Sequence, residues 1–344
     1  MKGLVYAGVG QPRVEERPKP TILKPTDAIV KIVQTTICGT DLHIFKGDVP
    51  TCKVGTILGH EGIAIVEQVG ESVKNFKPGD KVIIACITSC TTCYYCRRAM
   101  PSHCVEGGWM LGNVVDGTQA EYTRIPHADG SLHHTPKGVT DEELLLLSDA
   151  VPTGYECGVL QGKVQIGSTV AIVGSGPVGL GALITSHLYN PSKIIMIDLS
   201  EKRLTSARSF GATHTVISGP DTVKQVMELT NDKGVDVVIE AVGMPKSFEL
   251  CQELVAAGGT IANLGVHGKK VDLHLEKLWD RNICITTRVL DAVSTPMLIQ
   301  LVDSGKIQLG GLITHRFAFD EIVNAYSTSN AAEAHDCLKV AIQL

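Results

Sequence analysis

Four cysteines in one short stretch, CITSCTTCYYCRRAMPSHC, form the clearest chemical pattern in the sequence. Cys90, Cys93, Cys96 and Cys104 follow the spacing C-x2-C-x2-C-x7-C. Such a spacing can bring four thiolates together from a single loop, which is what a closed tetrahedral zinc site requires. We therefore predict a structural zinc lobe at about residues 88–106. The alternative is four unconnected buried thiols.

A second pattern fits a bound dinucleotide. The run GSGPVG follows the apolar strand expected at Thr169–Val173, opens a helix, and is followed by an acidic residue, Asp198, at the end of the next strand. Glycines at these points let the backbone approach a pyrophosphate at the helix N-terminus. The predicted phosphate-binding residues are Gly174, Gly176, Pro177, Val178 and Gly179.

Asp198 decides the expected cofactor. A carboxylate here can accept hydrogen bonds from the adenosine ribose hydroxyls and repel a 2′-phosphate, which favours NAD over NADP. Arg203 lies nearby and can accommodate a phosphate, so the preference is not absolute. The simpler interpretation of Asp198 is a cap on the helix that starts at Ser200.

Length and composition narrow the class of protein. The chain has 344 residues, 44% of them apolar, which is enough for two domains with full cores. Its net charge of −5 argues against a nucleic-acid surface. The N-terminal MKGLVYAG lacks the apolar core of a secretory signal, and eleven cysteines are an odd total for a disulfide framework. A reducing cytoplasm is the expected location.

One uncharged stretch, Ile166–Ser192, is long enough to imitate a membrane span. The glycines and the proline inside it would break a spanning helix, but they suit a strand, a tight turn and a helix. We therefore expect no membrane segment here.

The order of the elements predicts an α/β protein. Residues 1–153 show short strands and turns, as in an antiparallel, barrel-like domain, with examples at Lys2–Tyr6 and Gly62–Val69. Strands then alternate with helices over 154–294, the pattern of a doubly wound parallel sheet. Residues 295–344 supply two helical segments and a terminal strand, Cys337–Leu344, which is expected to return to the first domain.

Three further segments contain metal-ligand residue types: CGTDLH, with Cys38; GHE, with His60 and Glu61; and SDAVPTG, with Asp149. Together with the four-cysteine lobe and the glycine run, they resemble the zinc-dependent medium-chain alcohol dehydrogenases, especially the bacterial secondary-alcohol type. The similarity covers nearly the whole chain. It implies a Rossmann domain for NAD and a GroES-like catalytic domain.

The resemblance implies that Cys38, His60 and Asp149 hold a catalytic zinc, with Glu61 as an exchangeable fourth ligand. Asp41 would orient one of these ligands. Many relatives carry cysteine where this chain has Asp149, and a carboxylate there makes the metal more Lewis acidic. The alternative for Asp149 is a helix-capping carboxylate.

The remaining roles are also implied by the resemblance. A substrate hydroxyl bound to the catalytic zinc would lose its proton through Thr40 and a nicotinamide ribose hydroxyl to His43, and the alkoxide would give hydride to nicotinamide C4. The expected pocket residues are Cys86, Ile87 and Trp109, for which core packing is the alternative. Further cofactor contacts are expected from Val242, Val266, His267 and Lys339. For Lys339 a solvated lysine is the simpler interpretation.

The sequence thus predicts an NAD-dependent alcohol dehydrogenase with two zinc ions per chain, acting on small alcohols, aldehydes or ketones. A polyol or formaldehyde dehydrogenase of the same superfamily is the first alternative. Zinc-free quinone reductases are disfavoured because they lack the Cys38 and His60 pattern. A zinc module that binds nucleic acid or protein is the alternative from another class. The resemblance also implies a homo-oligomer, with a tetramer favoured over a dimer.

Overall fold

The computed structural model describes residues 1–344, which fold as two compact units. Unit 1 comprises Met1–Asp149 and Asp291–Leu344, and unit 2 comprises Ala150–Leu290. Each junction lies a few residues before the one expected from the sequence. No helix combines the length and the apolarity needed to span a bilayer. The uncharged stretch Ile166–Ser192 instead supplies a strand, a turn and a helix.

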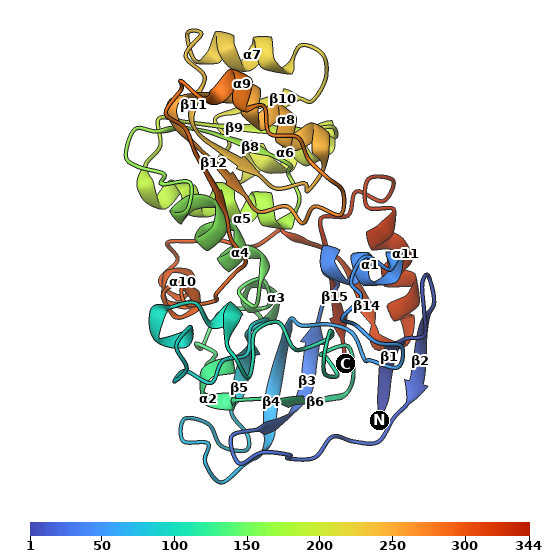
Figure 1. Cartoon of the computed structure of the whole chain (residues 1–344). Coiled ribbons are helices and arrows are strands. Elements are labelled where there is room, and N and C mark those ends of the chain that lie inside the picture. The colour runs from blue at the N-terminus through green and yellow to red at the C-terminus, as the bar shows by residue number, and fades with distance from the viewer. The chain divides into compact units, whose positions relative to one another are not determined.

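Unit 2 is built on a six-stranded parallel sheet in the order β10-β9-β8-β11-β12-β13. Figure 1 labels its strands β8 to β12. The chain moves outward from β8 on one side and outward from β11 on the other, so right-handed connections place helices on both faces. The strands are β8 (Thr169–Val173), β9 (Lys193–Asp198), β10 (His214–Ile217), β11 (Val235–Glu240), β12 (Val255–Asn263) and β13 (Cys284–Thr287). The helices are α4 (Ala150–Thr153), a π-helix (Gly154–Leu160), α5 (Pro177–Ser186), α6 (Glu201–Ser209), α7 (Thr222–Leu229), α8 (Pro245–Leu254) and α9 (Leu275–Leu278), with a 3₁₀ turn at His187–Tyr189. The doubly wound prediction is confirmed.

The glycine run forms the tight turn between β8 and α5. Gly174 has φ +102°, a conformation that residues with a Cβ rarely adopt. A Cβ on Gly179 would lie 1.9 Å from the carbonyl oxygen of Gly174, so only glycine lets the helix begin this close to the strand. Gly176 precedes the helix and Pro177 occupies its first turn, where a missing N–H costs no helical hydrogen bond.

Unit 1 contains a seven-stranded, mainly antiparallel sheet with the path β14-β15-β3-β4-β5-β7, to which β6 is added through β3. A separate hairpin pairs β1 (Lys2–Tyr6) with β2 (Pro12–Glu16). The sheet strands are β3 (Ala28–Thr35), β4 (Gly62–Val69), β5 (Lys81–Ile84), β6 (Tyr122–Ile125), β7 (Leu132–His134), β14 (Ile313–Ala318) and β15 (Lys339–Gln343). The helices are α1 (Gly39–Lys46), α2 (Ala128–Ser131), α3 (Asp141–Leu145), α10 (Thr295–Asp303) and α11 (Ile322–Asn330), with 3₁₀ turns at Cys96–Arg98, Pro101–His103 and Phe319–Glu321.

The late strand of the chain joins the first sheet, as expected, because β15 pairs with β3. It also pairs in parallel with β14, a strand that the sequence did not reveal. Its pattern, ITHRFA, alternates only weakly between apolar and polar residues. Strand β12 begins at Val255, directly after helix α8 ends at Leu254.

Candidate metal and cofactor sites

The register of the unit 1 sheet gathers the open metal site at one end. In the β3–β4 pair Thr35 lies opposite Gly62, so Cys38, just beyond β3, and His60, just before β4, leave the same edge. In the β4–β5 pair Gly62 lies opposite Ile84, which brings Cys86 to this edge as well. Sheet pairing thus assembles residues that are far apart in the sequence.

Cys38, His60, Glu61 and Asp149 form a compact donor group whose ligand atoms all lie within 4.8 Å of one another. Asp149 Oδ2 lies 3.6 Å from Cys38 Sγ and 3.3 Å from His60 Nε2. One thiolate, one imidazole and carboxylates are donors that zinc accepts, and three close donors leave a coordination position for a further oxygen.

The charges of this group fit a divalent cation. The thiol of Cys38 and the carboxyls of Asp149 and Glu61 face one another at a largely buried point. Burial alone would lower the pKa of His60, but its hydrogen bonds to Asp149 and Cys38 raise it well above its usual value. Burial also raises the pKa of Glu61, whose Oε2 is buried without a hydrogen-bond partner. Since these groups favour a nearby positive charge, the residues fit zinc.

Asp41 lies behind His60. Its Oδ1 is 3.8 Å from His60 Nδ1, and its Oδ2 accepts a 2.9 Å hydrogen bond from the backbone N–H of Cys38. A carboxylate on the far nitrogen of an imidazole fixes the ring and directs Nε2 at a metal. Asp41 therefore lies beside His60 and the Cys38 backbone, and its role of orienting a ligand stays a prediction.

Helix α1 carries both residues of the predicted proton relay. Thr40 Oγ1 is 3.5 Å from Cys38 Sγ, beside the metal donors. His43 lies one turn further along, where its side chain is 30% exposed and its Nδ1 is 3.0 Å from Asp48 Oδ2. The helix thus supplies one hydroxyl near the site and one imidazole that reaches solvent, and the relay itself stays a prediction.

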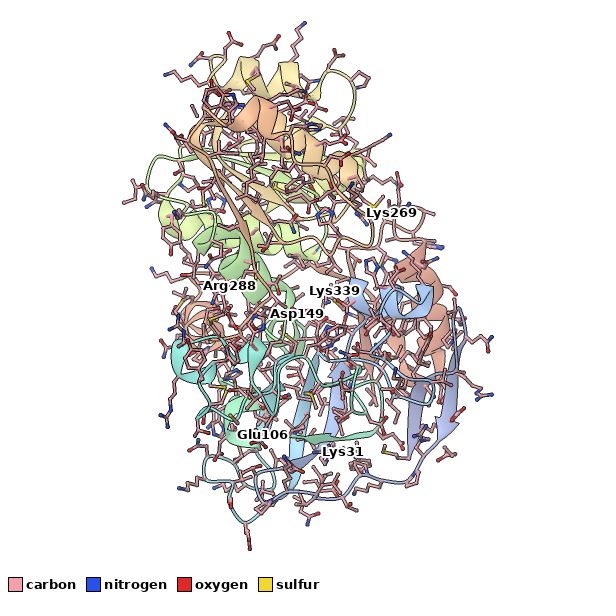
Figure 2. All side chains as sticks on the ribbon, viewed as in Figure 1. Lys31, Glu106, Asp149, Lys269, Arg288 and Lys339 are labelled. Carbon is pink, nitrogen blue, oxygen red and sulfur yellow. The ribbon has the colours of Figure 1, made fainter.

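Lys339 is buried, which makes the solvated interpretation wrong. Its Nζ lies 2.9 Å from Glu61 Oε1, and both side chains are almost fully enclosed. Figure 2 labels Lys339 and also Asp149 of the donor group. Burial alone would lower the pKa of the ammonium, but Glu61 and Cys38 raise it. Lys339 therefore balances part of the negative charge of the metal site. Its contact with cofactor phosphates stays a prediction.

The expected pocket residues also lie near this group. Cys86 and Ile87 are both only 4% exposed. The Cys86 thiol is kept protonated by burial and by the charge of Asp149, which raise its pKa well above the usual value. The Trp109 ring meets the His60 ring edge to face at a centroid distance of 6.1 Å. These contacts fit a pocket wall and also fit plain packing, so the substrate role stays a prediction.

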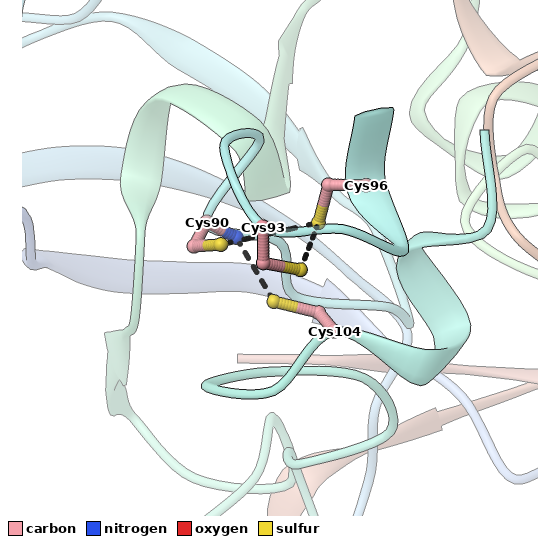
Figure 3. Close-up of side chains that lie close together, drawn as sticks. All are labelled: Cys90, Cys93, Cys96 and Cys104. Carbon is pink, nitrogen blue, oxygen red and sulfur yellow. Dashed lines mark hydrogen bonds between the residues drawn. The ribbon is translucent and has the colours of Figure 1, made fainter. Parts of the chain in front are cut away.

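The four-cysteine lobe converges as the spacing predicted (Figure 3). Sγ of Cys96 lies 3.5 Å from that of Cys93 and 4.0 Å from that of Cys90, close to the roughly 3.8 Å between sulfurs around tetrahedral zinc. All four thiols are free. Backbone N–H groups around Cys93 lower the pKa of its thiol to about 6, whereas burial raises that of Cys104 to about 12. Their sulfur donors and spacing fit a closed structural zinc site.

In unit 2 the carboxyl ends of four strands meet at the glycine turn. Strand register aligns Val173 with Ile197 and with Glu240, and Glu240 with Asn263. This places the glycine run, Asp198, Val242 and the segment around Val266 at one edge of the sheet, where ligands of doubly wound folds bind. Val242 and Val266 are about half exposed there, at 49% and 60%. Arg203 lies in the first turns of α6.

Three side chains around His267 were missed by the sequence reasoning. His267 Nε2 lies 2.8 Å from Asn263 Oδ1 and 3.5 Å from Glu240 Oε2. Glu240 is fully buried and accepts hydrogen bonds from the backbone N–H of Val242 and the Ser247 hydroxyl. His267 therefore belongs to a buried polar network that holds the two expected cofactor-binding segments together. No motif in the sequence signals it, because the partners come from two strands, β11 and β12, and from helix α8.

Comparison with known proteins indicates the same protein family as the metal and cofactor sites do. The family model of the alcohol dehydrogenase GroES-like domain matches residues 24–137, and that of zinc-binding dehydrogenases matches residues 177–303. An alcohol dehydrogenase of Cupriavidus necator is 35% identical, over 100% of this chain and 98% of its own length. The chain belongs to the zinc-dependent medium-chain alcohol dehydrogenase family. It is therefore an oxidoreductase of the alcohol dehydrogenase type.

Two further relatives of this family extend the comparison. The apo structure of zinc-dependent alcohol dehydrogenase 2 from Streptococcus pneumoniae is 53% identical, covers 100% of this chain and 98% of its own, and superimposes with a TM-score of 0.96. The NADP-dependent isopropanol dehydrogenase of Thermoanaerobacter brockii is 32% identical over 95% of each chain. The predicted family and fold class, including the GroES-like domain, are confirmed.

Proposed function

We propose that this enzyme reversibly oxidises primary or secondary alcohols to aldehydes or ketones with NAD. The observation that carries the proposal is the donor group of Cys38, His60 and Asp149, with the Thr40 hydroxyl 3.5 Å from Cys38 Sγ. When bound, zinc lowers the pKa of an alcohol hydroxyl and polarises a carbonyl, and the nicotinamide exchanges hydride with the carbinol carbon.

The chain's own residues would move the proton. Thr40, whose hydroxyl lies beside Cys38, would accept it from the substrate oxygen. His43, which reaches solvent and is held by Asp48, releases it to water. Asp41 keeps the His60 ring in place throughout, and Lys339 offsets the charge of Glu61. Cys86, Ile87 and Trp109 would shape the pocket for the carbon chain.

The cofactor proposal depends on Asp198. Its carboxylate, at the end of β9, would repel a 2′-phosphate, which supports NAD. The relative from Thermoanaerobacter brockii is NADP-dependent, so cofactor choice varies within the family. We further propose a cytoplasmic homo-oligomer, more readily a tetramer than a dimer. The odd total of eleven cysteines, four of them in a zinc pattern, supports a reducing compartment.

The test is the absorbance of NADH during incubation of the zinc-loaded enzyme with a panel of alcohols, and its loss with the matching aldehydes and ketones. We expect turnover of simple primary or secondary alcohols with NAD, and at least tenfold less with NADP. Turnover restricted to polyols or to formaldehyde adducts would move the assignment to another dehydrogenase of the superfamily. No turnover with any alcohol would contradict the proposal.

A further inference from the structure

A row of buried polar side chains leads from His60 into the core, away from Asp149. Asp41 Oδ2 accepts hydrogen bonds from the Cys38 backbone N–H at 2.9 Å and from Gln119 Nε2 at 3.2 Å, while Asp41 Oδ1 lies 3.8 Å from His60 Nδ1. One carboxylate therefore contacts the segments that carry two of the metal donors. Asp41 is only 1% exposed, so its charge depends on these protein donors.

Hydrogen bonds hold both ends of the Gln119 amide. It is fully buried, and its amide nitrogen donates both to Asp41 and, at 3.0 Å, to the carbonyl oxygen of Thr36. Its Oε1 accepts a 2.8 Å hydrogen bond from the hydroxyl of Tyr326 on α11. Because Thr36 O and Asp41 Oδ2 can only accept, they fix the amide with its nitrogen toward them. Its oxygen then accepts from Tyr326, which holds the far end of Gln119 in place.

Tyr326 is a buried and neutral hydrogen-bond donor to Gln119. Its side chain is 4% exposed and packs edge to face against Phe45 at a centroid distance of 5.0 Å. Burial and the nearby charge of Asp41 raise the pKa of its hydroxyl well above the usual value, so it stays a neutral donor. Buried hydrogen-bonded networks of this kind restrict the geometry of the groups that they hold.

We infer that Gln119 and Tyr326 are positioning residues of the catalytic metal centre, which act through Asp41 to fix His60 and Cys38. The inference rests on the proposed function, in which Cys38, His60 and Asp149 hold the catalytic zinc. An imidazole that binds zinc through Nε2 carries its proton on Nδ1 and directs it at Asp41. Gln119 then keeps the carboxylate turned so that one oxygen faces Cys38 and the other faces His60.

The test compares Tyr326→Phe, Gln119→Leu and Gln119→Glu with a matched control, Tyr6→Phe. Tyr6 also packs edge to face against Phe45 in the same core, and its hydroxyl lies outside the row that leads to Asp41. Zinc release from the holoenzyme to a chromogenic chelator is followed, and the open-site phase is the one that a Cys38→Ser variant lacks. The cobalt(II) absorption spectrum of each variant reports the geometry at that site.

We expect release from the open site to be about tenfold faster or more in Gln119→Leu, and faster still in Gln119→Glu, whose added carboxylate faces Asp41. Tyr326→Phe should accelerate release a few-fold and shift the cobalt spectrum, and Tyr6→Phe should do neither. Tyr326→Phe removes only one oxygen atom, so it decides the question if the Gln119 variants do not fold.

Two results would separate the inference from the proposed function. A wild-type enzyme with two zinc ions whose release and cobalt spectrum are unchanged in Tyr326→Phe and Gln119→Leu would overturn the inference alone. Equal acceleration in Tyr6→Phe would also overturn it, because the effect would then be general loosening of the core. A wild-type enzyme with only the cysteine-bound zinc would overturn both.

Discussion

The carboxylate of Asp198 accepts a 2.7 Å hydrogen bond from the backbone N–H of Ser175, inside the glycine run. Its second oxygen accepts another, of 2.9 Å, from the N–H of Ser200 at the start of α6. Asp198, which is expected to bind the adenosine ribose, therefore also links the phosphate-binding turn to helix α6. Replacing Asp198 with glycine therefore removes a charge and two structural hydrogen bonds at once.

Asp198→Gly should raise the efficiency with NADP relative to NAD at least tenfold, about 1.4 kcal/mol, because the repulsion of a 2′-phosphate is removed. Asp198→Asn is the control: it loses the charge but keeps one oxygen for these N–H groups. If repulsion decides the preference, both variants shift it, as measured by kcat/KM with each cofactor. A wild-type enzyme that already prefers NADP would exclude this role.

Elemental analysis should find two zinc ions per chain, one closed by four cysteines and one open. A chelator should remove zinc from the open site before the closed site. Activity should therefore be lost while the fold persists. Cys93→Ser should lower the melting temperature, because it leaves the closed site with three ligands. Cys284→Ser, a partly exposed thiol in unit 2, is the matched control. Unchanged melting of the Cys93 variant would contradict a structural zinc.

The proton relay predicts different pH profiles for two variants at full zinc occupancy. His43→Gln should slow alcohol oxidation roughly tenfold near neutral pH and recover partly at high pH, because hydroxide can then accept the proton directly. Thr40→Ala should cost roughly a hundredfold or more, because the hydroxyl beside Cys38 is the first link. Equal, pH-independent losses in both would show that these residues shape the pocket and conduct no proton.

Acid should weaken unit 1 through His133, on strand β7. Burial lowers the pKa of its imidazole to about 4, whereas an unfolded histidine titrates near its usual value of about 6.5. Between these values the unfolded chain binds the proton and the folded chain does not, so stability falls as the pH drops through this window, by at most about 3 kcal/mol. His133→Leu should flatten this part of the curve of unfolding free energy against pH. His134→Gln, at the exposed neighbouring position, should leave it intact.

Local patterns carried most of what the sequence could predict. The four cysteines of the lobe share one loop, so their spacing alone predicted that they converge. The alternation of strands and helices over unit 2 likewise predicted its sheet, because each element is specified by its own periodicity. The grouping of Cys38, His60 and Asp149 needed the family resemblance. Cys38 and His60 meet only through the register of β3 and β4, and Asp149 follows Ser148, whose carbonyl oxygen accepts from the Cys86 N–H beyond β5.

Contacts between distant segments escaped prediction for the same reason. Gln119 follows a loop glycine-threonine pair, and Tyr326 lies on a helix with ordinary apolar spacing, so neither has a motif. Their hydrogen bond spans 207 residues of sequence. From the sequence alone, Lys339 is most simply interpreted as a solvated lysine. Only the pairing of β15 with β3 shows that it enters the core beside Glu61.

The Glu61–Lys339 ion pair has a consequence for biosynthesis. Its two members are 278 residues apart, so the ribosome makes Glu61, Cys38 and His60 long before their counter-charge exists. Until residue 339 has been translated and β15 has docked beside β3, the buried acidic donors lack the ammonium that offsets them. The mature charge balance of the metal pocket is therefore reached late in synthesis. Zinc that binds before that point would bind to a site that has one more uncompensated negative charge than the same site in the finished enzyme.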